Sequence, residues 1–90
     1  MAVIVRIPTM LRPMVGGRES ISATGRTVRE TLDHLDAQYE GFRERVCDEA
    51  GIRKAVSVFV NGEDVRFLQG LDTPVGDGDE LSIVPALAGG

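Results

Sequence analysis

Alternation of hydrophobic and polar side chains along the chain predicts several short β-strands. Four stretches carry this pattern: residues 2–7, 19–23, 55–60 and 80–84. In the first stretch only Arg6 is polar, so we expect both faces of that strand to be at least partly covered. In the last stretch Leu81 and Ile83 share one face, which is typical of a half-buried strand.

Turn-forming residues separate these stretches. Residues 9–18 contain one proline and two glycines, and a connection this short favours an antiparallel hairpin between the first two strands. Asn61-Gly62 is typical of a type I′ turn, because both central residues of that turn need positive φ. A short return strand is expected to follow it over residues 63–67. Asp77-Gly78-Asp79 predicts a further turn before the last strand.

The clearest single element is a helix. Thr27 and Glu30 stand three residues apart, as in a capping box that satisfies the first main-chain donors of a helix. An apolar stripe follows at spacings of four, three and four residues: Val28, Leu32, Leu35 and Tyr39. Gly41 is expected to break this helix. A second short helical piece is expected from Phe42 to about Asp48, with Gly51 placed to end it.

This order of elements predicts an α+β domain. One main helix would cover one face of a mixed sheet of four to five strands. The chain has 90 residues, which lies within the range of roughly 50–200 residues for a single core. We therefore expect residues 1–84 to form one domain, and residues 85–90, which begin at Pro85, to form a flexible C-terminal tail.

Charge and composition exclude several classes of function. The chain has 10 Lys and Arg against 14 Asp and Glu, a net charge of −4, whereas nucleic acids and anionic membrane surfaces attract basic proteins. Its apolar runs are far shorter than the roughly 20 residues of a transmembrane helix. Its first residues lack the basic region and cleavage site of a signal peptide. We therefore expect a cytoplasmic protein that binds neither nucleic acid nor membranes.

Reactive side chains are few. Cys47 is the one cysteine and His34 the one histidine, which excludes an internal disulfide and leaves little for a metal site. Cys47 is expected to act as a small hydrophobic residue at the edge of the core, and His34 to be solvated on the polar face of the main helix. The acidic run at residues 77–80 lacks the distal glutamate of a calcium loop. We therefore expect the chain itself to bind no metal and no cofactor.

The chain ends in Gly89-Gly90. Glycine has no Cβ, so this pair can pass through a narrow channel and lead to the α-carboxylate of Gly90. That carboxylate is ionised at neutral pH and is a poor electrophile. An activating enzyme would have to convert it to a mixed anhydride before a nucleophile could attack it. On the residues alone, the alternative is an ordinary chain terminus without a function.

Taken together, these residues resemble the ubiquitin-like sulfur carrier proteins of the ThiS/MoaD family, which serve the synthesis of thiamine, molybdopterin and cysteine. The resemblance covers essentially the whole chain. Its most specific parts are Asp77-Gly78-Asp79-Glu80-Leu81, Pro85 and the terminal Gly89-Gly90. Within the family, the chain is most similar to the actinobacterial carriers of cysteine biosynthesis through Ile7-Pro8-Thr9, Leu11-Arg12-Pro13, Gly16-Gly17, Glu63-Asp64-Val65-Arg66-Phe67, Gly70-Leu71 and Pro85-Ala86.

The resemblance implies a β-grasp fold and a carrier on which enzymes act, rather than an enzyme. An E1-like enzyme would adenylate Gly90 with ATP, and a sulfur donor would convert the adenylate to a thiocarboxylate. A pyridoxal-phosphate-dependent cysteine synthase would use that sulfur on a product of O-phosphoserine. A zinc metallopeptidase would then release cysteine and restore Gly90. ATP, pyridoxal phosphate and zinc would therefore be bound by partners.

The resemblance also implies where partners contact the chain. In family members the apolar residue just before the tail proline, here Val84, contacts the activating enzyme. Leu87 is a second expected anchor, and Ala88 and Gly89 would lie in the partner's channel. Phe59 could contact a partner from an exposed sheet face, although core packing is the favoured role for this aromatic side chain.

Three alternatives remain open. The sulfur could pass to molybdopterin, thiamine or a specialised metabolite instead of cysteine. The chain could be a ubiquitin-like modifier whose Gly90 is joined to lysines of target proteins. It could also be a plain interaction domain with an incidental glycine tail.

Overall fold

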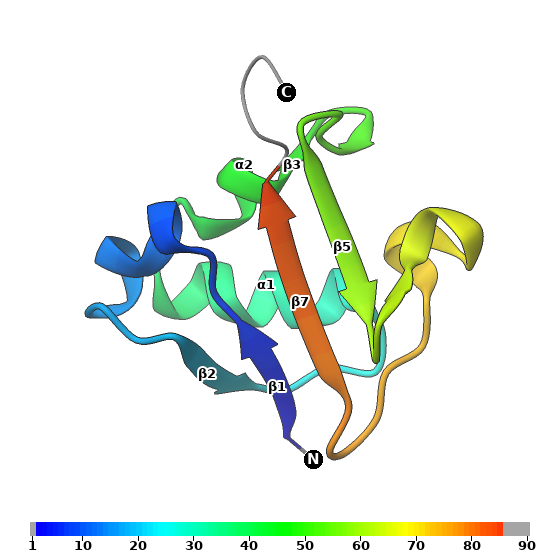
Figure 1. Cartoon of the computed structure of the whole chain (residues 1–90), viewed down its shortest axis with the longest axis horizontal. Coiled ribbons are helices and arrows are strands. Elements are labelled where there is room, and N and C mark those ends of the chain that lie inside the picture. The colour runs from blue at the N-terminus through cyan, green and yellow to red at the C-terminus, as the bar shows by residue number, and fades with distance from the viewer. Residues whose placement is uncertain (1, 86–90) are drawn as a thin grey trace.

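Five strands form a mixed sheet in the order β2-β1-β7-β5-β6 (Figure 1). The computed structural model describes residues 2–85. The strands are β1 (Val3–Arg6), β2 (Ser20–Ala23), β5 (Val56–Val60), β6 (Glu63–Asp64) and β7 (Glu80–Pro85). β1 and β7 are parallel neighbours in the interior of the sheet, and the other neighbouring pairs are antiparallel. The predicted mixed sheet is therefore confirmed.

Helix α1 (Val28–Gln38) covers one face of this sheet (Figure 1). The Oγ1 of Thr27 accepts a hydrogen bond from the N–H of Glu30 at 3.2 Å. The Glu30 carboxylate accepts the N–H of Arg26 at 3.0 Å, whereas the second bond of an ideal capping box would come from Thr27. The predicted cap is confirmed, with its second bond moved by one residue.

The core lies between α1 and the sheet. Alternate residues of β1, β2, β5 and β7 point toward the apolar stripe of the helix. The buried strand side chains include Val3, Val5, Val58, Leu81 and Ile83, and those of α1 include Val28, Leu32 and Leu35. The opposite face of β1 is exposed at Ala2, Ile4 and Arg6. Ile4 is 41% exposed, so this face is only partly covered, which agrees with the expectation of at least partial cover on both faces, and α1 covers the other face.

A second helix, α2 (Phe42–Val46), follows Gly41, whose φ is 87°. A small two-stranded sheet comes next, made of β3 (Cys47–Asp48) and β4 (Gly51–Ile52). The second helix was expected to continue to about Asp48, but it ends at Val46, and Cys47 and Asp48 form β3. The chain then reverses, because the Asp48 side chain accepts the N–H of Ala50 at 2.9 Å. Within residues 2–85, no helix has the length and apolar character needed to cross a membrane.

The connections contain the 3-10 helices η1 (Thr9–Val15), η2 (Val65–Phe67) and η3 (Gly70–Asp72). Asn61 and Gly62 have φ of 51° and 87°, which confirms the predicted type I′ turn. The return strand expected over residues 63–67 is shorter than predicted. Within residues 63–67 only Glu63 and Asp64, which form β6, pair with β5, because the Asp64 carboxylate accepts the N–H of Arg66 at 2.9 Å and begins η2.

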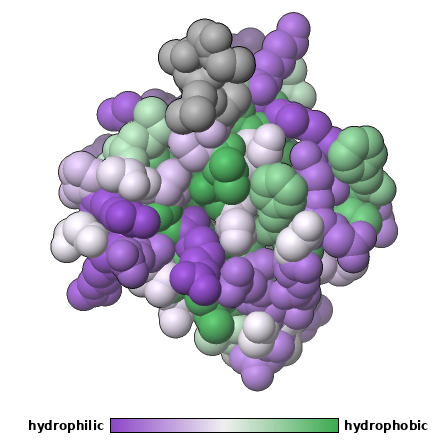
Figure 2. Space-filling model, in the orientation of Figure 1, coloured by the Kyte–Doolittle hydropathy of each residue, from purple (hydrophilic) through white to green (hydrophobic). Residues whose placement is uncertain are grey.

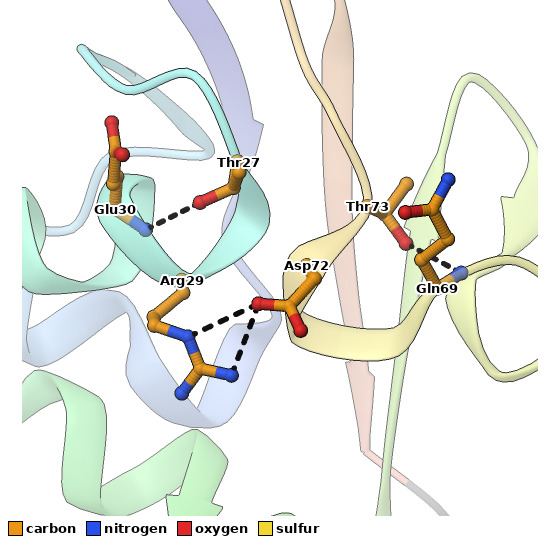
Figure 3. A network of polar contacts seen from close by, with 6 residues as sticks. All are labelled: Thr27, Arg29, Glu30, Gln69, Asp72 and Thr73. Carbon is orange, nitrogen blue, oxygen red and sulfur yellow. Dashed lines mark hydrogen bonds and ion pairs between the residues drawn. The ribbon is translucent and has the colours of Figure 1, made fainter.

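The connection before β7 is fastened to the start of α1 (Figure 3). The Arg29 guanidinium donates to Asp72 Oδ1 at 3.2 Å, and Thr73 Oγ1 accepts the N–H of Gln69 at 3.1 Å. The N–H of Val28 also donates to the carbonyl of Thr73 at 3.0 Å. These bonds hold the chain in place before it turns into the interior strand β7.

Candidate functional site

The last described residue, Pro85, ends an interior strand. β7 is paired on one side with β1 and on the other with β5, and Pro85 lies opposite Val56. The sheet therefore fixes the point from which residues 86–90 continue. Four predicted site residues lie outside the described residues: Leu87, Ala88, Gly89 and Gly90.

The sheet face opposite α1 carries apolar side chains that reach as far as the end of β7. Val84 is 46% exposed and Ile4 is 41% exposed on this face, and Phe59 is half-buried on it. Figure 2 shows apolar surface over the sheet among polar side chains. We call Ile4, Phe59 and Val84 the open-face patch.

Phe59 points away from the core. It lies opposite Ser82 in the pairing of β5 with β7, while Val56, Val58 and Val60 at alternate positions are buried. The favoured expectation of core packing for Phe59 is wrong, because successive residues of a strand point to opposite faces. Its contact with a partner stays a prediction, and the open-face position leaves it accessible for that contact.

Short polar and paired charged side chains surround the open-face patch. Arg6 Nε lies 3.4 Å from Glu80 Oε2, and each side chain of this ion pair is about half exposed. Four serines share the face: Ser20, Ser22, Ser57 and Ser82. Because these side chains are short, the apolar ones between them are accessible to a flat partner surface. Protein interfaces commonly combine a few apolar anchors with a polar rim in this way.

Two neighbouring hollows lie between η1 and the end of β7. The smaller has a volume of about 150 Å³, and its apolar lining consists of Pro8, Met10, Leu11, Val56, Ile83 and Pro85. Arg45 adds a charged side chain to that lining. The larger hollow, of about 570 Å³, shares part of this wall and extends it to Arg12 and Val84. We call the smaller hollow the η1 pocket.

Sequence reasoning missed an exposed apolar pair, Phe67 and Leu68, whose side chains are 87% and 42% exposed. The predicted strand would have placed Phe67 in a hydrogen-bonded ladder, but η2 turns it outward. Val65, two residues earlier, is fully buried and anchors this turn. Asp64 is the residue that could have indicated η2 in the sequence, since aspartate is preferred just before a helical turn.

Cys47 and His34 have structural roles. Cys47 is 6% exposed, which confirms its predicted place at the edge of the core. Burial raises the pKa of its thiol above the ordinary value of 9.0, although nearby Arg43 acts in the opposite direction. A thiol that stays protonated at neutral pH is a weak nucleophile. His34 is half-buried, and its Nδ1 accepts the N–H of Thr24 at 3.2 Å, so the expectation of a merely solvated histidine is wrong.

The two turns that the sequence predicts around β5 and β7 are bonded to each other. The Asp79 carboxylate accepts bonds from Asn61 Nδ2 at 3.1 Å and from the N–H of Gly76 at 2.8 Å. The Asn61 side-chain oxygen in turn accepts the N–H of Glu80 at 2.9 Å. Asp79 thus stabilises a turn, as its sequence context predicts. Across residues 2–85, no three His, Cys, Asp or Glu side chains are grouped so that they could hold a metal ion.

Comparison with known proteins agrees with this architecture. The model of the ThiS family matches residues 5–90. The chain is 46% identical to the sulfur carrier protein CysO of Mycobacterium tuberculosis over the full length of both proteins. It is 38% identical to small archaeal modifier protein 3 of Haloferax volcanii over 71% of this chain and 70% of that protein. A chain in the crystal structure of the BexX/CysO complex of Amycolatopsis orientalis superimposes with a TM-score of 0.94 and 46% identity, covering 99% of this chain and 100% of that one. The chain therefore belongs to the ThiS family of ubiquitin-like sulfur carrier proteins, and its sheet and helix form their β-grasp fold.

Proposed function

We propose that this protein carries sulfur as a thiocarboxylate on Gly90 and delivers it to cysteine biosynthesis from O-phosphoserine. The observation that carries the proposal is the position of β7, which is held on both sides within the sheet and ends at Pro85, just before the tail. A rigid domain with a short reactive extension suits a cosubstrate that enters the active sites of other enzymes. The full-length likeness to CysO supports cysteine as the final product.

The reaction sequence uses one group of this chain, the main-chain carboxylate of Gly90. An E1-like enzyme transfers AMP from ATP to that carboxylate and releases pyrophosphate. The sulfur of a donor then displaces AMP and leaves the thiocarboxylate. In a pyridoxal-phosphate-dependent cysteine synthase this sulfur adds to the aminoacrylate made from O-phosphoserine, which joins the new cysteine to Gly90 as a thioester. An acyl shift from sulfur to nitrogen converts this bond to an amide, and a zinc metallopeptidase hydrolyses the amide, which releases cysteine and restores the carboxylate. ATP, pyridoxal phosphate and zinc are bound by these partners, and the steps take place in the cytoplasm.

The open-face patch provides the surface on which such a partner holds the domain. Val84 is accessible one residue before Pro85, so a partner that covers it also fixes the direction of the tail. Phe59 on the neighbouring strand extends the same contact. Burying an apolar side chain contributes about 1.5–3 kcal/mol. Leu87 adds an anchor within the tail, and the small residues Ala88 and Gly89 fit a narrow channel.

Intact-mass analysis tests the loading step. The purified chain is incubated with its activating enzyme, ATP and a sulfur donor, and we expect the mass increment of one oxygen-to-sulfur exchange. A variant with one alanine added after Gly90 should fold equally well and gain no sulfur. Loading of the extended variant, or no increment in the unmodified chain, would contradict chemistry at Gly90.

A second assay separates cysteine from the other sulfur acceptors. The thiocarboxylate form is mixed with O-phosphoserine and the synthase, and the product should be heavier than the unloaded carboxylate chain by one cysteine residue at its terminus. If sulfur leaves the chain only when a molybdopterin or thiamine precursor is supplied, the cysteine assignment is wrong while the carrier chemistry stands.

Protein modification is the second candidate function, because the chain is similar to a small archaeal modifier protein. A modifier would form amide bonds from Gly90 to lysines of other proteins. These conjugates would have a higher mass and would resist thiol reagents. The chain has a single lysine, Lys54, so polymers built through its own lysines would all be joined at that residue.

A further inference from the structure

The η1 pocket lies beside the residue from which the tail continues. Pro85 contributes to its lining, and the neighbouring strand residue Ile83 forms part of the same wall. The pocket has a volume of about 150 Å³ and is lined mainly by apolar side chains. A dry apolar cavity of roughly this volume can bind benzene, so the pocket has room for one branched aliphatic side chain.

The tail contains one large apolar side chain, that of Leu87. Alternation along β7 turns Leu81, Ile83 and Pro85 to the side of the sheet that faces α1, and Leu87 follows Pro85 by two residues in the sequence. Two residues span at most about 7 Å. Leu87 can therefore reach the pocket without passing to the other face of the sheet.

The parallel pairing of β1 with β7 brings η1 to the same end of the sheet. Arg6 lies opposite Ser82, so the chain that continues from β1 enters η1 at the level where β7 ends. Met10 of η1 lines the pocket and is 67% exposed. Methionine is flexible and adapts to the shape of its neighbours, so Met10 can fold over a side chain seated in the pocket.

We propose that the η1 pocket binds the side chain of Leu87 in the free protein, with Met10 covering it. The occupant is thus a segment of the chain itself, joined covalently to the pocket through Pro85. This inference goes beyond the proposed function, because it describes the tail before any partner binds. An activating enzyme that needs the extended tail must first withdraw Leu87, and its apparent affinity is reduced by the fraction of chains that are docked.

Methyl NMR on the full chain tests this docking directly. We expect nuclear Overhauser contacts from the Leu87 methyl groups to the Met10 methyl and to an Ile83 methyl. Leu87→Ser should abolish these contacts and shift the Met10 and Ile83 resonances. Leu87→Met should keep those two resonances close to their original positions, because its apolar side chain refills the pocket. Ala86→Ser is the matched control, since it introduces the same hydroxyl group one residue before Leu87, and it should leave all the contacts in place.

Two results would overturn the proposal. One is the absence of these contacts together with identical Met10 and Ile83 resonances in the unmodified chain and in Leu87→Ser. The other is the appearance of the contacts only between differently labelled chains in a mixed sample, which would mean that a second copy supplies Leu87. Sulfur loading is measured separately by mass, so failure of the docking leaves the proposed function standing.

Discussion

The Arg66 guanidinium donates a hydrogen bond to the main-chain carbonyl of Val56. Val56 lies opposite Pro85, and β6 pairs with β5 only at Phe59 and Val60, so β6 ends before it reaches this carbonyl. Arg66 therefore takes the place of a missing strand neighbour at the end of the sheet from which the tail continues. A side chain on η2 thus steadies the base of the tail.

Replacing Arg66 should lower stability by a measurable amount. Arg66→Met keeps an apolar stem but removes the donors to the carbonyls of Val56 and Arg53. Hydrogen bonds that involve a charged group contribute about 1.5–3 kcal/mol. Because Arg66 is exposed, we expect the free energy of unfolding to fall by an amount near the lower limit of this range. Thermal unfolding should show a midpoint lower by about 4–8 °C per kcal/mol lost.

Arg18→Met is the control for this experiment. Arg18 is exposed, and its side chain makes no hydrogen bond or ion pair with the described part of the chain. Its replacement should leave the midpoint nearly unchanged. Equal midpoints for the two variants would mean that Arg66 does not support the end of the sheet.

Gly25 should not tolerate a side chain. A Cβ at this position would lie 2.6 Å from both the main-chain nitrogen and the Oγ1 of Thr31, and Thr31 is fully buried in α1. Gly25→Ala should therefore lower the free energy of unfolding by about 1–3 kcal/mol, as overpacking commonly does. Gly76→Ala is the matched control, because the nearest atom to its Cβ is the Asp79 side chain at 3.9 Å. Urea unfolding of the two variants tests the difference, and equal losses would contradict the close packing at Gly25.

A charge at Val84 should impair loading while leaving the fold intact. Val84→Asp places a carboxylate in the open-face patch beside the tail, where we propose that the activating enzyme binds. Loss of an interface hot spot costs 2 kcal/mol or more, which corresponds to a decrease in kcat/KM of roughly 30-fold.

Leu68→Asp is the control for position, because Leu68 is 42% exposed after η2 and lies outside the open-face patch. It should change kcat/KM far less. If both variants load sulfur as fast as the unmodified chain, with unchanged circular dichroism, the patch is not the docking surface of the activating enzyme.

Cys47 should make stability depend on pH in alkaline solution. Burial raises the pKa of its thiol above 9.0 in the folded state, so the unfolded thiol ionises first as the pH rises. The folded state then holds more protons, and the free energy of unfolding falls with a slope of at most about 1.4 kcal/mol per pH unit. The contribution of Cys47 is complete below pH 9.0 and is lost as the pH rises through the raised pKa.

Urea unfolding from neutral pH to about pH 10 measures this slope. Cys47→Ala should show a shallower decline, even though its absolute stability is lower because of the cavity. Tyr39 and Lys54 are present in both proteins, so the difference between the two slopes belongs to the thiol. Parallel curves would show that the pKa of Cys47 does not differ between the folded and unfolded states.

Features that depend on a few neighbouring residues were predictable from the sequence. The Thr27 cap and the Asn61-Gly62 turn are local, and the structure confirms both. The bonds between Asn61 and Asp79 join residues 18 positions apart, so no short window of sequence indicates them. Two separate motifs thus became one structural unit only in the folded chain.

The errors arose where tertiary pairing overrode a local preference. Core packing is the favoured of the two expected roles for Phe59, but three alternating valines on β5 occupy the core face. The residues after Val46 continue a helical pattern, yet Cys47 pairs with Ile52 in β3 and β4. The expected role of Gly90 involves its terminal carboxylate and partner enzymes, and Gly90 lies outside the described residues. The loading assay tests this role.

The parallel contact of β1 with β7 joins the two ends of the described chain. The N–H of Ile4 donates to the carbonyl of Asp79 at 2.9 Å, and the N–H of Ala2 donates to the Asp77 side chain, 75 positions away. Contacts between such distant residues close a very long loop, and folds rich in them fold in roughly milliseconds to seconds. A chain still being synthesised cannot complete its sheet before β7 has emerged. Under the chemistry that we propose at Gly90, a chain whose synthesis stops before β7 lacks both the central strand and the group that would be loaded.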